Sequence, residues 1–102
     1  MTKFSVLMSV YEKENHEFLN SSLKSIVNQS VVADEIIIVK DGELNEKLNS
    51  VLSFFSKKFN QLKVIGYKKN RGLGYALNYG LNNSSNEIIL CSIDITLSKL
   101  FI

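Results

Sequence analysis

The stretch "DEIIIVKDGEL", residues 34–44, decides the fold. Its aliphatic run, residues 36–39, is typical of a strand that is buried on both faces, as strands of a parallel sheet are. The run ends shortly before Asp41 and Gly42, and glycine permits the backbone turn that a following helix requires. The stretch therefore predicts a buried strand that delivers a carboxylate to the edge of a sheet.

Three further segments repeat this aliphatic pattern, at residues 3–10 (KFSVLMSV), 62–67 (LKVIGY) and 86–93 (NEIILCSI). Between the strands, apolar residues recur at helical spacing, with Asn15 as the expected N-cap of the first helix. The three apolar stripes are Leu19, Leu23, Ile26 and Val27; Leu44, Leu48, Val51, Leu52, Phe55 and Phe59; and Leu73, Ala76, Leu77, Gly80 and Leu81. Alternating strands and helices predict an α/β, doubly wound fold: a mainly parallel sheet of about four strands with three helices.

Composition narrows the class of protein. The 102 residues are 45% hydrophobic and carry a formal net charge of +2, which suits one globular domain without the dense basic stripe of a nucleic-acid surface. The single cysteine, Cys91, cannot form an internal disulfide. No apolar run approaches the roughly 20 residues of a membrane helix. We therefore expect a soluble cytoplasmic protein with no nucleic-acid partner, and leave open peripheral contact with the inner face of the membrane.

In α/β sheets, ligands bind beyond the carboxyl ends of the strands. Asp41 ends the second strand, where its carboxylate either accepts an N–H group of a base or caps the following helix. Tyr11 offers a ring that stacks on a base or is simply a rim tyrosine. Ser9 lies on the same side of the sheet as Tyr11, and Glu12 either binds ribose hydroxyls or is solvated.

The segment "NRGLGYALN", residues 70–78, follows the third strand. Arg71 and Gly72 precede a helix whose N-terminus suits a diphosphate, although a tight turn with an ordinary surface arginine is an equal alternative. The segment lacks the six-residue glycine fingerprint of dinucleotide-binding domains, because Leu77 takes the third glycine position. Asp94, at the end of the fourth strand, is a candidate ligand for a divalent metal ion.

In their order and spacing, Ser9-Val10-Tyr11, "VKDG", "KNRGLGYALNYGL" and "SNEII" followed by Asp94 resemble the N-terminal nucleotide-sugar half of bacterial family 2 glycosyltransferases. These enzymes have the GT-A, or nucleotide-diphospho-sugar transferase, fold. The resemblance runs from Phe4 to about Asp94. It implies strand order 3-2-1-4 and an enzyme of polysaccharide biosynthesis that transfers a hexosyl group from a nucleoside diphosphate sugar, most often a UDP sugar, with Mg²⁺ or Mn²⁺.

The resemblance also implies roles for single residues. Tyr11 would lie against the base, Asp41 would bind its N–H edge, Ser9 and Glu12 would line the ribose, Arg71 and Gly72 would face the diphosphate, and Asp94 would be the first carboxylate of the metal motif. The second carboxylate of that motif is replaced by Thr96.

We interpret residues 1–102 as a single domain, the N-terminal donor-binding half of such an enzyme, truncated and without the acceptor domain. It is expected to lack catalytic completeness, and no catalytic residue is assigned. The fourth strand would form an uncovered sheet edge, which predicts self-association through this edge or the tail "ITLSKLFI", residues 95–102. A non-catalytic interaction module that uses the same edge and tail is the alternative, and a flavodoxin-type or dehydrogenase-type domain is less favoured.

Overall fold

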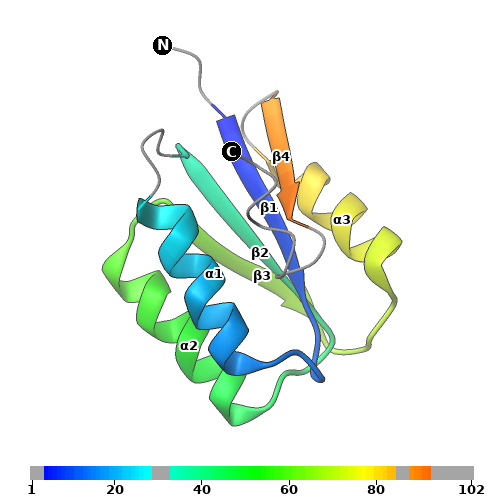
Figure 1. Cartoon of the computed structure of the whole chain (residues 1–102). Helices are drawn as coiled ribbons and strands as arrows, with labels where there is room; N and C mark the ends of the chain where they lie inside the picture. The colour runs from blue at the N-terminus through cyan, green and yellow to red at the C-terminus, as the bar shows by residue number, and fades with distance from the viewer. Residues whose placement is uncertain (1–3, 29–32, 85–87, 93–102) are drawn as a thin grey trace.

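The computed structural model describes residues 4–28, 33–84 and 88–92 (Figure 1). Strands and helices alternate through these residues as the sequence predicts. The elements are β1 (Phe4–Val10), α1 (His16–Asn28), β2 (Glu35–Asp41), α2 (Glu46–Lys58), β3 (Leu62–Tyr67), α3 (Leu73–Asn82) and β4 (Ile88–Ser92). Asp41 is the last residue of β2, so its side chain stands at the carboxyl end of the sheet.

The four strands form one parallel sheet in the order β3-β2-β1-β4, which confirms the predicted fold class and strand order. Helices α1 and α2 cover one face of the sheet and α3 covers the other (Figure 1). β4 pairs with β1 and lies at the edge of the sheet. The register sets Ser9 beside Val39, and Asp41 beside Tyr67.

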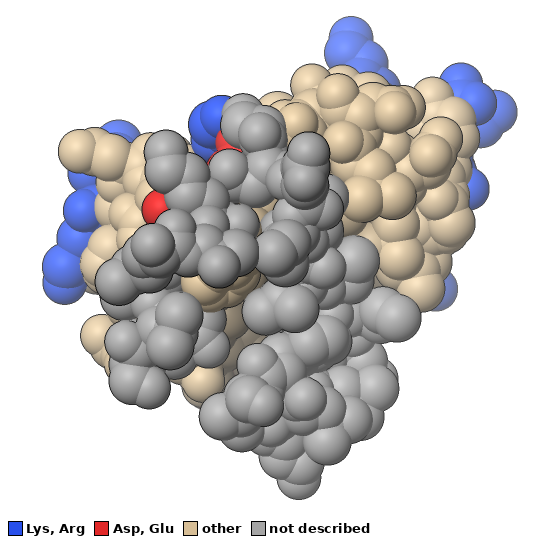
Figure 2. Space-filling view, turned by 90° about the horizontal axis from the view of Figure 1, so that it is seen from above, with Lys and Arg blue, Asp and Glu red and all other residues tan. Residues whose placement is uncertain are grey.

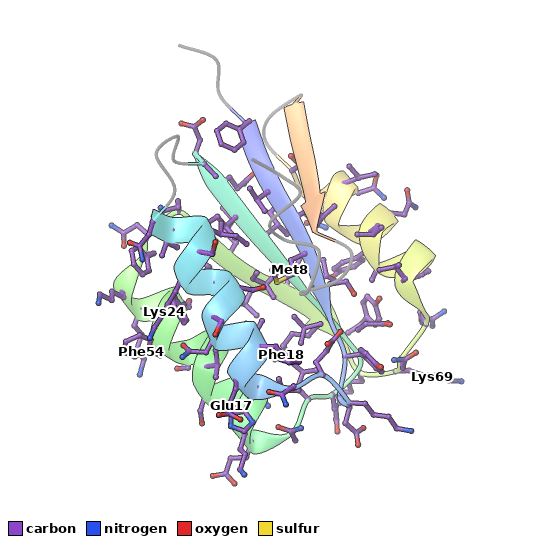
Figure 3. All side chains as sticks on the ribbon, viewed as in Figure 1. Met8, Glu17, Phe18, Lys24, Phe54 and Lys69 are labelled. Atoms are coloured by element: carbon purple, nitrogen blue, oxygen red, sulfur yellow. The ribbon has the colours of Figure 1, made fainter. Side chains whose placement is uncertain are left out.

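The side-chain alternation of a strand divides the core into two layers. Even-numbered residues of β1 and β2 face α1 and α2; this larger cluster includes Met8 (Figure 3), Ile38 and Phe55. Odd-numbered residues such as Leu7, Ile37 and Val39 face α3, where they pack with Ala76. Each fully buried aliphatic side chain contributes about 1.5–3 kcal/mol, so the α1–α2 layer provides most of the stability. The smaller α3 layer packs against the odd-numbered side chains of β1 and β2.

Asparagines are the N-cap residues of the first two helices. Asn15 caps α1, because its Oδ1 accepts hydrogen bonds from the backbone N–H groups of Glu17 (2.8 Å) and Phe18 (3.2 Å). This contact confirms the predicted N-cap. Asn45 caps α2 by accepting from the N–H of Leu48 at 2.9 Å, and its Nδ2 donates to the carbonyl of Glu12 at 3.1 Å. That second bond ties the β1–α1 connection to the start of α2.

Gly42 allows the turn after β2 to pack tightly against the connection before α3. Its φ is +92°, and a Cβ at this position would lie 2.8 Å from the backbone nitrogen of Asn70. A side chain would therefore meet both an unfavourable backbone conformation and a fixed neighbour.

We expect Gly42→Ala to lower the free energy of unfolding by about 2–4 kcal/mol, from backbone strain together with overpacking. Gly74→Ala is the matched control, because Gly74 lies in α3 with open space around its Cβ position. The control should raise stability by up to about 1 kcal/mol, since alanine favours helix over glycine. Urea unfolding measures both variants. Equal midpoints would show that the approach to Asn70 does not constrain the fold.

Candidate functional site

A cavity of about 320 Å³ lies at the carboxyl ends of β1 and β2. The strands β1 and β2 contribute to it, with the β1–α1 connection, the β3–α3 connection and the first residue of α3. Its lining residues are Ser9, Tyr11, Glu14, Asp41, Asn70, Gly72 and Leu73. The volume falls at the lower end of the range of small-molecule pockets. The predicted residues Ser9, Tyr11, Asp41 and Gly72 therefore share one cavity.

The β1 side of the cavity carries a tyrosine and a serine. Ser9 is half-buried at the end of β1, and the exposed Tyr11 follows at the next position on the same side of the sheet. The N–H of Glu14 donates to the carbonyl of Tyr11 at 3.1 Å, and this turn brings Glu14 to the cavity. Glu14 was not predicted from the sequence as a residue of the site. Glu12 is exposed and does not line the cavity.

Asp41 is the buried charged group of the cavity, with 4% of its surface exposed. Its Oδ1 accepts from the hydroxyl of Tyr67 and from the N–H of Arg71, both at 2.8 Å, and its Oδ2 accepts from the N–H of Gly72 at 3.1 Å. Charge-assisted hydrogen bonds of this kind offset the cost of burying a carboxylate. The alternative that Asp41 caps the following helix is wrong, because Asn45 caps α2 and Asp41 instead binds the connection that precedes α3.

Tyr67 was not anticipated as part of the site. It ends β3 directly beside Asp41 in the parallel register, and its ring packs edge-on against Tyr75 (5.1 Å between centroids) and Tyr79 (5.2 Å). Burial, followed by the hydrogen bond to Asp41, raises the pKa of Tyr67 well above its ordinary value. The phenol therefore stays protonated and donates at neutral pH. The sequence signal for Tyr67 was its place at the end of the aliphatic run of β3, since Asp41 ends the aliphatic run of β2 in the same way.

Arg71 uses its backbone and its side chain differently. Its N–H binds Asp41, whereas its guanidinium lies over the ring of Tyr75, 5.0 Å from the centroid. This is the geometry of a cation–π contact. Arg71 is exposed beside the first turn of α3 and does not line the cavity, while Gly72 does.

The predicted metal ligand Asp94 lies outside the described residues. Within the described ranges, no group of three or more His, Cys, Asp or Glu side chains is placed to hold a metal ion. Asp41 belongs to no such group, and N–H and O–H donors take three of the acceptor positions on its oxygens. Helices in the same part of the chain are all too short or too polar to cross a membrane.

A second hollow, of about 550 Å³, lies on the outer surface between α1 and α2, where Glu17, Lys24 and Phe54 contribute to its lining (Figure 3). It is larger than the cavity at the strand ends, but no described residue of the predicted site lines it. We therefore take the smaller cavity as the candidate functional site. On the face drawn in Figure 2, basic side chains of the described residues lie at separate places around the margin, with no continuous stripe.

Comparison with known proteins finds relatives of one kind. The sequence model of glycosyl transferase family 2 matches residues 5–92. Over 88 residues the chain is 42% identical to a UDP-Gal:alpha-D-GlcNAc-diphosphoundecaprenol beta-1,3-galactosyltransferase of Escherichia coli, covering 86% of this chain and 32% of that protein. Over 86 residues it is 40% identical to an amylovoran biosynthesis glycosyltransferase of Erwinia amylovora, covering 84% of this chain and 32% of that protein.

Among solved structures, the chain is similar to a mannosyltransferase from Pyrobaculum calidifontis in complex with GDP-Man and Mn²⁺. The TM-score is 0.76 at 19% identity, and the match covers 89% of this chain and 27% of that chain. This likeness shows a shared GT-A fold. The chain spans 32% of the length of each of the two curated relatives described above.

We expect Asp41→Ala to lower the free energy of unfolding by about 2–4 kcal/mol, because it leaves two backbone N–H groups and a phenol without their acceptor. Glu43→Ala is the matched control, since Glu43 is an exposed carboxylate in the adjacent turn and should change stability by less than about 0.5 kcal/mol. Chemical denaturation measures both. Equal stability of the two variants would contradict a structural role for the Asp41 hydrogen bonds.

Proposed function

The chain belongs to glycosyl transferase family 2, and from this premise we propose that its strand-end cavity binds the nucleotide of a nucleoside diphosphate sugar. The chain is then the donor-binding part of a glycosyltransferase that builds bacterial polysaccharide. The observation that carries the proposal is the convergence of Ser9, Tyr11, Asp41 and Gly72 on one cavity from two strands and two strand–helix connections. An aromatic face, a hydroxyl and a buried acceptor are the groups that a nucleoside requires.

In this proposal the base stacks on Tyr11 and donates a ring N–H to Asp41, with UDP as the nucleotide. Ser9 and Glu12 lie on the ribose side. Arg71 supplies a planar guanidinium, and the N-terminus of α3 after Gly72 supplies backbone N–H groups, so that both act on the diphosphate. Reaching the phosphates requires the Arg71 side chain to leave the ring of Tyr75, which a contact at an exposed site permits at a cost of about 0.5–1 kcal/mol.

For the metal, we propose that Asp94 is the one carboxylate that this chain gives to Mg²⁺ or Mn²⁺, with phosphate oxygens and waters as the other ligands. When bound, the ion neutralises charge on the leaving diphosphate. Transfer also needs a general base near the acceptor hydroxyl, and we assign that role to no residue of this chain. We propose the cytoplasm as its compartment, in keeping with the single Cys91.

The nucleotide test uses UDP, GDP, CDP and ADP with Mn²⁺ in a thermal-shift series. At 100 times its dissociation constant a ligand stabilises by about 2.7 kcal/mol, which for a domain of this size raises the melting temperature by about 10 °C or more. We expect such a shift for UDP. A flat response to the whole panel would remove the proposal.

Arg71→Ala should reduce the UDP shift by weakening contact with the diphosphate. The matched control is Lys69→Ala, which removes a positive charge from the same connection, where Lys69 points away from the protein (Figure 3). Equal losses in the two variants would indicate general electrostatic attraction in place of a defined arginine contact.

We also propose that the chain associates with itself through the outer edge of β4 or through residues 95–102. β4 is an edge strand of the sheet, and an edge strand offers unpaired backbone groups with which another chain can pair. Light scattering across micromolar concentrations should give a mass at least twice that of the monomer. A monomer mass throughout this range would refute it. Assembly that persists in an Asp41→Ala, Arg71→Ala double variant, together with no nucleotide binding by the wild type, would favour a non-catalytic interaction module.

A further inference from the structure

The acceptor capacity of Asp41 is almost fully used inside the protein. An ionised carboxylate offers about four lone-pair positions, two on each oxygen. Oδ1 accepts from the Tyr67 hydroxyl and the Arg71 N–H, and both positions on this oxygen are filled. Within the described part of the chain, Oδ2 accepts from the N–H of Gly72 alone. One acceptor position therefore remains, on Oδ2, in a residue that lines the cavity.

Tyr67 is the donor that holds Asp41 independently of the β3–α3 connection. The other two donors are backbone groups of residues 71 and 72, in a connection that the Asp41 carboxylate itself helps to hold. Tyr67, in contrast, is fixed by its place at the end of β3 and by edge-on contacts with Tyr75 and Tyr79. Together with the Arg71 N–H, its hydroxyl fills Oδ1 of Asp41, so the free acceptor position lies on Oδ2.

One free acceptor position matches some bases better than others. Uracil presents a single ring N–H between two carbonyl groups. Guanine presents a ring N–H beside an amino group, and pairing both of these donors uses both oxygens of a carboxylate. Cytosine has an amino donor on this edge, but in place of the ring N–H it presents a nitrogen that is itself an acceptor, and the carboxylate repels that nitrogen. The occupied Oδ1 therefore disfavours guanine, and the charge on Asp41 disfavours cytosine.

We propose that Tyr67 is a positioning residue for base selection: by occupying Oδ1 of Asp41, it leaves one acceptor position and makes the cavity select uracil over guanine. This inference rests on the proposed nucleotide-binding function. Tyr67 acts through Asp41 and does not touch the nucleotide. It is therefore a specificity determinant outside the set of residues that line the cavity.

The test compares UDP, GDP and CDP binding by isothermal titration calorimetry. For the wild type we expect UDP to bind about tenfold more tightly than either of the other two nucleotides, as a hydrogen bond to a charged group allows. In Tyr67→Phe the ring keeps its packing but Oδ1 regains a free position and the carboxylate loses its fixed orientation. UDP affinity should fall, and the preference for UDP over GDP should fall by about threefold or more, whereas the preference over CDP, which comes from the charge on Asp41, should change less.

Tyr79→Phe is the matched control. It removes a hydroxyl from the same aromatic cluster, but that hydroxyl donates to the carbonyl of Gly66 at 3.4 Å and not to Asp41. The control should leave the preference unchanged. In an Asp41→Ala background, Tyr67→Phe should have no further effect on the preference, because the group through which Tyr67 acts is absent.

A ratio of affinities separates positioning from a purely structural role, since loss of stability affects the binding of all three nucleotides alike. An unchanged ratio of UDP to GDP affinity in Tyr67→Phe, with UDP still bound, overturns this inference and leaves the proposed function standing.

UDP methylated at the ring nitrogen N3 gives a second measurement that needs no variant. It should bind the wild type no better than CDP does, and binding equal to that of UDP would also overturn the inference. A wild type that binds no nucleotide overturns both proposals.

Discussion

A buried carboxylate needs hydrogen-bond donors that offset the cost of burying its charge, and Asp41 meets this need with donors from β3 and from the β3–α3 connection. The Tyr67 hydroxyl comes from the end of β3, and the N–H groups of Arg71 and Gly72 come from the start of α3. The same atoms that keep the charge in place therefore join β2, β3 and α3 at the carboxyl end of the sheet. These bonds hold the connection before α3 over the cavity, together with the close packing of Asn70 against Gly42.

The parallel register explains why these groups meet. Asp41 and Tyr67 end neighbouring strands at the same level, so their side chains emerge on the same face of the sheet. Ser9 emerges on this face as well, because the odd-numbered residues of β1 point toward α3. A slip of one residue in either pairing would turn a side chain to the face covered by α1 and α2. The large apolar cluster on that face holds the register and, through it, the geometry of the cavity.

Much of this arrangement could be predicted from local patterns. The aliphatic runs and helical stripes locate the four strands and three helices, and Asn15 caps α1 as its position before the apolar stripe suggests. The prediction placed Ser9, Tyr11 and Asp41 at the strand ends, and they line one cavity. Their roles toward a nucleotide remain predictions. The interpretation of Asp41 as a cap for α2 was wrong because a local Asp-Gly pattern gives no sign of donors that lie about 30 residues away along the chain.

Hydrophobic periodicity is a property of neighbouring residues, and for this reason the primary structure alone specifies an α/β sheet with its polar residues at the strand ends. Which of those residues touch each other depends on strand register and on the approach of Asn70 to Gly42, and both arise from contacts between distant segments. Tyr67, Glu14 and the single free acceptor position of Asp41 belong to this second kind of information. Their places in the site arise only when the sheet forms. Hydrogen bonds between strands and connections depend on positions in space that no local pattern encodes.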